Sequence, residues 1–224
     1  MTSLLTLHED HIGTQSQLWH IPAGGLLLEG ELRLPANAGG LVVFAHATRH
    51  STRNQALAEE FAEAGLGTLL LDLLTPEEQR RGSVTGVRRR DIELLARRLG
   101  GVVRWLERQP RMGEVKTGCI GAGLGAAAAL VAAADLSNHI AAVVSRGGRP
   151  DLAGEALSKV RTPTLLIVGG NEEDLVLLNE DAFAEMRWRR DLKILPGTTH
   201  RFEEPGKLRE VARLSANWFR QYLA

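Results

Sequence analysis

The sequence predicts an α/β protein: a three-layer α/β/α arrangement around a mainly parallel sheet. Short apolar runs alternate with amphipathic helical patterns along the chain, as they do in βαβ units. Runs such as Leu41–Ala45 (LVVFA) and Thr164–Val168 (TLLIV) are continuously apolar, which is typical of strands buried on both faces. No linker, repeat or low-complexity tract interrupts the 224 residues, so we expect a single domain over residues 1–224.

The first third of the chain contains the start of this sheet. Leu26–Leu34 alternates apolar and polar residues before a proline, as an edge or meander strand does. Leu41–Ala45 is the first buried strand, and Asn54–Ala64 has helical spacing that stops at a glycine. Gly67–Leu71 (GTLLL) is expected as the next strand. The charged, turn-rich segment Thr75–Arg89 is expected to be a loop or a short helix.

The middle of the chain continues the alternation. Asp91–Arg108 is expected to be a long amphipathic helix with Asp91 as its N-cap. Val115–Ile120 is the next expected strand, and Gly125–Ala134 is a helix of small residues. Ala141–Ser145 (AAVVS) is expected to be a strand and Leu152–Ser158 a helix, which completes another βαβ unit.

The last part of the chain adds two strands and two helices. Thr164–Val168 is expected to be a strand, Ala182–Arg190 a helix, Leu192–Leu195 (LKIL) a strand and Leu208–Tyr222 a closing amphipathic helix. Ligands of such sheets bind outside the carboxyl ends of the strands. Functional residues are therefore expected in the loops that follow the strands.

Composition limits the classes of function. The 27 Lys and Arg residues balance 27 Asp and Glu residues, so no net charge attracts nucleic acid or an anionic membrane. The single cysteine, Cys119, excludes an internal disulfide and fits a reducing compartment. Met1–Gln17 does not have the basic-then-apolar pattern of a signal peptide, and no apolar run reaches about 18 residues, so we expect neither secretion nor a membrane span. We expect a cytoplasmic protein with a small-molecule substrate and no nucleic-acid or membrane partner, and the composition leaves a homodimer open.

The stretch GCIGAGLGAAAAL, residues 118–130, is a strand, a glycine-rich turn and a helix. Gly121–Ala126 fits the dinucleotide pattern G-x-G-x-x-A, and Arg146 after the next strand could bind a 2′-phosphate. Three strands precede this turn, however, whereas dinucleotide domains usually open with it. The turn also has the form of a nucleophile elbow, G-x-S-x-G, except that Gly123 stands at the nucleophile position. A third interpretation is that Gly123 only relieves backbone strain.

Elements elsewhere in the chain favour the elbow. A hydrolase triad on this fold follows the order nucleophile, acid, histidine. Three carboxylates, Glu172, Glu173 and Asp174, follow the strand TLLIV, and His200 follows the last strand. The first buried strand leads into Ala47, where an oxyanion loop would begin.

Motifs along nearly the whole chain carry a family resemblance. They are LEGELRLP, VVFAH, RHSTRN, LLLDLLTPEE, DIELLARRL, GAGLGAAAAL, VVSRGGRPDLAG, PTLLIVGG and PGTTHRFEEPG. The sequence resembles the dienelactone-hydrolase-like branch of the α/β-hydrolases. The resemblance implies an α/β-hydrolase fold without a large lid, and a Ser- or Cys-dependent hydrolase of esters or lactones. It also implies that His200 is the family histidine and that Glu172 replaces the usual Asp.

Two departures from the family pattern fall in the active-site loops. Gly123 stands where a serine is expected, which removes covalent catalysis. The oxyanion loop is shortened to His46-Ala47-Thr48. The remaining candidates are the Leu124 N–H at the start of a helix, and an N–H from Ala47 or Thr48, as oxyanion donors. His200, oriented by a carboxylate, is a candidate base near neutral pH.

These candidates predict a cofactor-free, His200-dependent enzyme that acts on a small carbonyl, ester or lactone compound by water activation or proton transfer. Arg49 and His50 are candidate substrate-binding residues, and no metal or cofactor is expected. Cys119 and Ser145 are expected to be structural. Arg146 and Arg149 are expected to pair with Asp151, and contact with a carboxylate of a ligand is the alternative for both. The alternatives are a non-catalytic binding or scaffold relative, an altered or designed variant of a serine esterase, and an NADP-binding Rossmann protein.

Overall fold

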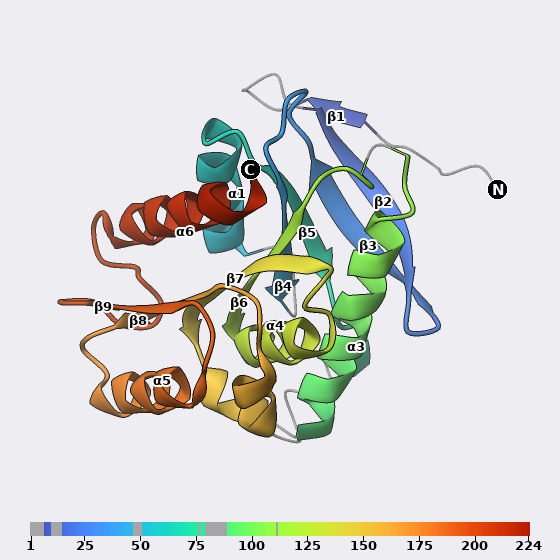
Figure 1. The fold of residues 1–224 in the computed structure, drawn as a ribbon. Helices are drawn as coiled ribbons and strands as arrows, with labels where there is room; N and C mark the ends of the chain where they lie inside the picture. The colour runs from blue at the N-terminus through green and yellow to red at the C-terminus, as the bar shows by residue number, and fades with distance from the viewer. Residues whose placement is uncertain (1–6, 10–14, 47–50, 76, 79–88, 111) are drawn as a thin grey trace.

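The computed structural model describes residues 7–9, 15–46, 51–75, 77–78, 89–110 and 112–224. Within these residues the strands join into one nine-stranded sheet, in the order β1-β2-β3-β5-β4-β6-β7-β8-β9 (Figure 1). The strands are β1 (Leu7–Glu9), β2 (Gln15–Ala23), β3 (Leu26–Arg33), β4 (Leu41–His46), β5 (Gly67–Asp72), β6 (Thr117–Gly123), β7 (Ile140–Gly148), β8 (Thr164–Gly169) and β9 (Arg190–Leu195).

The sheet has an antiparallel part and a parallel part. Strands β1, β2 and β3 form an antiparallel meander, and β3 pairs with β5 antiparallel. From β5 through β4, β6, β7 and β8 to β9 every pairing is parallel. The mainly parallel sheet predicted from the continuous apolar runs is therefore confirmed.

Helices cover both faces of the sheet (Figure 1). The helices are α1 (Thr52–Glu63), α3 (Arg89–Leu106), α4 (Leu124–Asp135), the 3-10 segment η1 (Pro150–Lys159), α5 (Glu173–Glu185) and α6 (Lys207–Leu223). Helices α1 and α6 pack together on one face, and α3, α4, η1 and α5 cover the other. This is the expected three-layer α/β/α architecture. No helix in the described ranges is long and apolar enough to cross a membrane.

Each face has its own apolar core. On the α1/α6 face, Phe61 contacts both Phe44 and Phe219, with ring centroids 5.8 and 5.7 Å apart. On the other face, the small side chains of α4 let the helix lie close to the sheet. A Cβ atom at Gly125 would clash with the backbone oxygen of Ala45, so only glycine permits this approach.

Several local expectations are wrong. Strand β2 was not expected, and the helix expected over Ala182–Arg190 is instead α5, which begins nine residues earlier at Glu173. Acidic residues in its first turn favour that start, because they complement the helix dipole. Asp91 is not an N-cap, because α3 begins at Arg89 and Asp91 lies in its first turn.

Two further segments differ from the expectation or fall partly outside the described residues. The segment expected as the helix Leu152–Ser158 is 3-10 and breaks at Gly154, which has φ 54°. Of the loop or short helix expected over Thr75–Arg89, residues 76 and 79–88 lie outside the described residues.

Candidate active site

The elbow lies between β6 and α4. Strand β6 ends at Gly123 and α4 begins at Leu124. Gly123 has φ 52° and ψ −123°, a conformation that costs a residue with a side chain about 1–3 kcal/mol. A Cβ atom built on Gly123 would meet no described atom within 4 Å. Among the described residues, nothing therefore blocks the first atom of a side chain at this position.

The histidine and its carboxylate lie on two neighbouring loops. His200 follows β9, and Glu172 follows β8, directly before α5. The ring Nδ1 of His200 lies 2.8 Å from Oε1 and 2.9 Å from Oε2 of Glu172. The backbone N–H of His200 also donates to Oε2, at 2.5 Å. Of the three candidate carboxylates, Glu172 is the one that contacts His200, whereas Glu173 and Asp174 lie in the first turn of α5.

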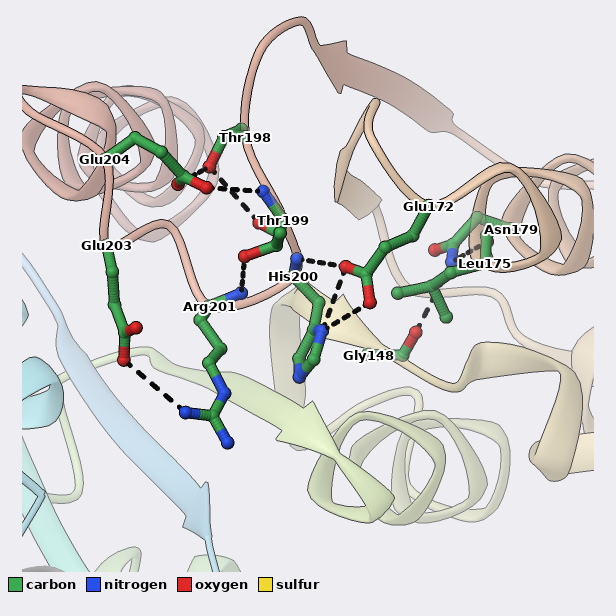
Figure 2. A network of polar contacts seen from close by, with 10 residues as sticks. All are labelled: Gly148, Glu172, Leu175, Asn179, Thr198, Thr199, His200, Arg201, Glu203 and Glu204. Carbon is green, nitrogen blue, oxygen red and sulfur yellow. Dashed lines mark hydrogen bonds and ion pairs between the residues drawn. The ribbon is translucent and has the colours of Figure 1, made fainter.

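The charge state of Glu172 determines which nitrogen of the His200 ring carries the proton. Partial burial alone would raise the pKa of Glu172, but hydrogen bonds from the backbone and the ring of His200 bring the pKa below its ordinary value. An ionised carboxylate holds the proton on Nδ1 and leaves Nε2 as the basic nitrogen. Figure 2 shows Nε2 turned away from Glu172. The His200 side chain is 45% exposed, so a small molecule can reach it.

Glu204 holds the loop that carries His200. The Thr198 hydroxyl and the Thr199 N–H both donate to its carboxylate, the second at 3.1 Å (Figure 2). These bonds, the one from Thr198 first, lower the pKa of Glu204. Phe202 has φ 55° and is buried under the same loop. A left-handed φ at a bulky residue is strained, so the packing around Phe202 must hold it there.

The carboxyl end of β7 contacts both the loop that carries His200 and the turn that contains Gly123. A Cβ atom on Gly147 would clash with the backbone of His200, which shows that the two backbones touch. The next residue, Gly148, pairs with Gly123 in the β6–β7 ladder, and the N–H of Arg149 donates to the Gly123 oxygen at 3.1 Å. His200 and Gly123 therefore lie at the same edge of the sheet, on either side of the end of β7.

The other predicted residues have mixed outcomes. Leu124 is the first residue of α4, as expected. Four of the predicted oxyanion and substrate-binding residues lie outside the described residues: Ala47, Thr48, Arg49 and His50. The expected pairing with Asp151 is confirmed for Arg149, by contacts of 2.8 and 2.7 Å. It is wrong for Arg146, which contacts Asn54 and His46.

The structural role expected for Cys119 and Ser145 agrees with their burial. Cys119 and Ser145 are both fully buried. Burial also raises the pKa of the Cys119 thiol to about 12, which keeps it protonated at neutral pH.

Arg146, Asn54 and His46 form a polar cluster beside the site, and the sequence did not indicate that these three residues contact one another. Arg146 of β7 donates through Nη2 to Oδ1 of Asn54 at 3.0 Å, and Nη2 lies 3.3 Å from Nε2 of His46. Burial, then the positive charges of Arg146 and Arg53, lower the pKa of His46 to about 3. His46 and Arg146 are 100 residues apart, so no local motif joins them; only their positions at the ends of two strands indicated proximity.

The sheet order, the elbow between β6 and α4, and the His200–Glu172 pair define an α/β-hydrolase. The dienelactone hydrolase family model matches residues 28–222, and the chain belongs to this family. A dienelactone hydrolase from Anabaena variabilis is 46% identical and superimposes with a TM-score of 0.88 over 93% of this chain and 99% of its own. A cold-adapted esterase from an Arctic intertidal metagenomic library is 15% identical, with a TM-score of 0.76 over the whole of both chains, and supports the fold alone.

Curated relatives from two strains of Mycobacterium tuberculosis are named "Putative phosphoribosyl transferase". Each is 50% identical over 207 residues, which is 91% of this chain and 46% of the relative. The chain therefore spans about half the length of the curated relatives it matches.

Proposed function

We propose that this chain is a cofactor-free enzyme that uses His200 as a general base on a small ester, lactone or other carbonyl compound. The observation that carries the proposal is the hydrogen bonding of His200 Nδ1 to the ionised Glu172, which leaves Nε2 directed away from that pair. With glycine at position 123, the reaction has no covalent serine intermediate.

Two reactions fit this arrangement. In the first, Nε2 takes a proton from a water molecule as the water oxygen attacks the substrate carbonyl carbon. The proton then passes from Nε2 to the leaving alkoxide, and an acid and an alcohol are released. In the second, Nε2 removes a proton next to a carbonyl group and returns it at another atom. In both reactions the negative charge that forms on the carbonyl oxygen would be stabilised by the Leu124 N–H at the start of α4.

Family membership favours the elbow over the dinucleotide interpretation of the glycine turn. Residues 28–222 match the family as one unit, and this range contains the turn of residues 121–126 between β6 and α4, which supports its interpretation as the elbow. The names of the longer curated relatives point to a different chemistry. We infer that phosphoribosyl transfer would belong to the part of those relatives outside the matching region, and that the matching half carries the hydrolase-type site.

The test is turnover of a panel of small esters, lactones and enol-lactones by the wild-type chain and by His200→Ala. The matched control is His139→Ala, because His139 contacts Glu107 through Nδ1 at 2.7 and 2.9 Å in the same manner, but precedes β7. We expect His200→Ala to lower kcat at least about 10²-fold and His139→Ala to leave it unchanged. Equal turnover by wild type and His200→Ala would refute the proposal, and no turnover of any panel member would favour a non-catalytic binding role.

A further inference from the structure

A buried arginine, Arg146, lies beside the His200 loop, and no acidic residue in the described part of the chain pairs with it. Arg146 is 5% exposed and stands two residues before the end of β7. Its contacts within the described residues are with the amide oxygen of Asn54 and the ring of His46, both of which are neutral acceptors. By contrast Arg98, which is also buried, does have an ion pair: it contacts Glu78 through two hydrogen bonds of 2.7 Å.

Two N–H groups of this cluster lack acceptors among the described residues. They are Nε of Arg146 and Nδ1 of His46, and both atoms are buried. Because Arg146 donates to Nε2 of His46, the neutral His46 ring carries its proton on Nδ1. Both atoms are therefore buried donors, and a buried donor without an acceptor is costly.

The charge of the cluster is also unbalanced. Burial, and then the positive charge of Arg53, lowers the pKa of Arg146 to about 10. Arg53 itself pairs with Glu203 at the surface, at 2.5 Å. A buried guanidinium without a counterion is expensive, and a guanidinium binds carboxylate and phosphate groups with two parallel hydrogen bonds. An oxyanion bound to the guanidinium would compensate this charge.

The cluster lies at the same edge of the sheet as the candidate active site. Gly147, the residue after Arg146, contacts the His200 backbone, and His46 is the last residue of β4. We propose that Arg146, supported by His46, binds a carboxylate or phosphate group of the molecule on which the His200 site acts. The link to the substrate rests on the proposed function, whereas binding of the anion can be measured without turnover.

The experiment titrates the wild-type chain with inorganic phosphate, and separately with acetate, at constant ionic strength set with sodium chloride. Thermal unfolding and isothermal titration calorimetry are the two readouts. We expect at least one of the two anions to bind at a single site and to raise Tm by about 3–6 °C at ten times its Kd. A response to phosphate alone identifies a phosphorylated ligand, a response to acetate alone identifies a carboxylate ligand, and a response to both identifies a general oxyanion subsite.

Three variants separate an anion subsite from a structural role. Arg146→Met should abolish the anion response, and its ligand-free Tm should be unchanged or higher, because an uncompensated buried charge has been removed. Arg146→Lys keeps a charge but loses the planar fork, so we expect binding weakened at least about 10-fold. Arg213→Met removes an exposed charge on α6 and should respond as the wild type does.

The outcomes distinguish this proposal from the proposed function. No response of the wild type to either anion, or an equal response of Arg146→Met, overturns the anion subsite. If Arg146→Met does not fold, the wild-type titration and Arg146→Lys decide the question. His200→Ala should bind the anion as the wild type does. Anion binding without turnover would therefore contradict only the proposed His200-dependent activity. Turnover without anion binding would contradict only the Arg146 anion subsite.

Discussion

The carboxylate of Glu172 holds His200 at two points, through the ring Nδ1 and through the backbone N–H. His139 and Glu107 share the ring contact, with nearly the same distances, at the other end of β7. The backbone contact and the position at the carboxyl edge of the sheet distinguish the Glu172 pair. The two pairs therefore provide an internal comparison between a histidine that faces a candidate site and one that does not.

The first prediction concerns the orientation of the base. In Glu172→Gln the side chain can still bind the backbone N–H, but it no longer carries the charge that stabilises a protonated ring. We expect kcat on any substrate found in the panel to fall about 10²-fold or more, with a smaller change in KM. Glu173→Gln is the matched control, since Glu173 is exposed in the first turn of α5. A kcat within twofold of the wild type would show that Glu172 does not orient the base.

The second prediction concerns the elbow. A Cβ atom at position 123 meets no described atom within 4 Å, so Gly123→Ser should fold, at a cost of about 1–3 kcal/mol for its backbone conformation. We expect its hydroxyl, next to the oriented His200, to give covalent chemistry that the wild type lacks. The measurement is mass-spectrometric labelling by a fluorophosphonate, together with a burst of p-nitrophenol from p-nitrophenyl acetate.

Gly123→Ala is the control for this change, because it carries the same backbone strain without a hydroxyl. It should be destabilised to the same extent and should not be labelled. If Gly123→Ser folds and is not labelled either, the histidine and position 123 do not form a working triad geometry.

The central sheet could be predicted because its strands are buried on both faces. Leu41–His46 and Thr164–Gly169 are buried along almost their whole length, and that burial produces the continuous apolar runs. Strand β2 could not be found in this way. It lies next to the edge strand β1, and its sequence, Gln15–Ala23, contains several polar residues and a proline instead of a continuous apolar run. Strand β2 is held in place by its pairing with β1 and β3, and this pairing does not require a particular order of polar and apolar residues in β2 itself.

The candidate site likewise has one part that the sequence predicted and another that it did not. The order of the loops along the chain predicted that His200 and one acidic residue after TLLIV would meet, because parallel strands end at one edge. The choice of Glu172 depends on where α5 begins, which the sequence placed wrongly. The contact between Arg146 and His46 joins strands that β6 separates in the sheet, so only the assembled sheet reveals it.

The third prediction concerns pH. The pKa of His46 is about 3 in the folded chain and about 6.5 when unfolded, so the unfolded state binds the proton more readily. The contribution of His46 to stability is complete above about pH 6.5 and is lost as pH falls toward 3. Urea unfolding in buffers free of phosphate and carboxylates should show His46→Gln losing about 3 kcal/mol less than the wild type between pH 6.5 and 4.

His20→Gln, on an exposed residue of β2, is the control, and it should follow the wild-type pH dependence. Other groups also titrate in this range, so the difference between wild type and His46→Gln isolates the His46 contribution. Parallel pH curves for these two proteins would contradict a neutral His46 in the folded state.

The fourth prediction compares two neighbouring arginines on α3. Arg98 is 3% exposed and binds both Glu78 and the Leu73 carbonyl, whereas Arg97 is exposed. Arg98→Met leaves Glu78 and that carbonyl without their donor, so we expect the free energy of unfolding to fall by about 2–4 kcal/mol at pH 7. Arg97→Met should change it by less than about 0.5 kcal/mol.

The pH dependence of the same pair gives an independent check. The hydrogen bonds from Arg98 are the main cause that lowers the pKa of Glu78 to about 2. An acid with a lowered folded-state pKa stabilises the protein above its unfolded pKa of about 4.3, and this contribution is lost as pH falls toward 2. The stability gap between wild type and Arg98→Met should therefore narrow from pH 5 to pH 2 in urea unfolding. A gap that stays constant over this range would show that Arg98 stabilises the fold by packing and not through the charge of Glu78.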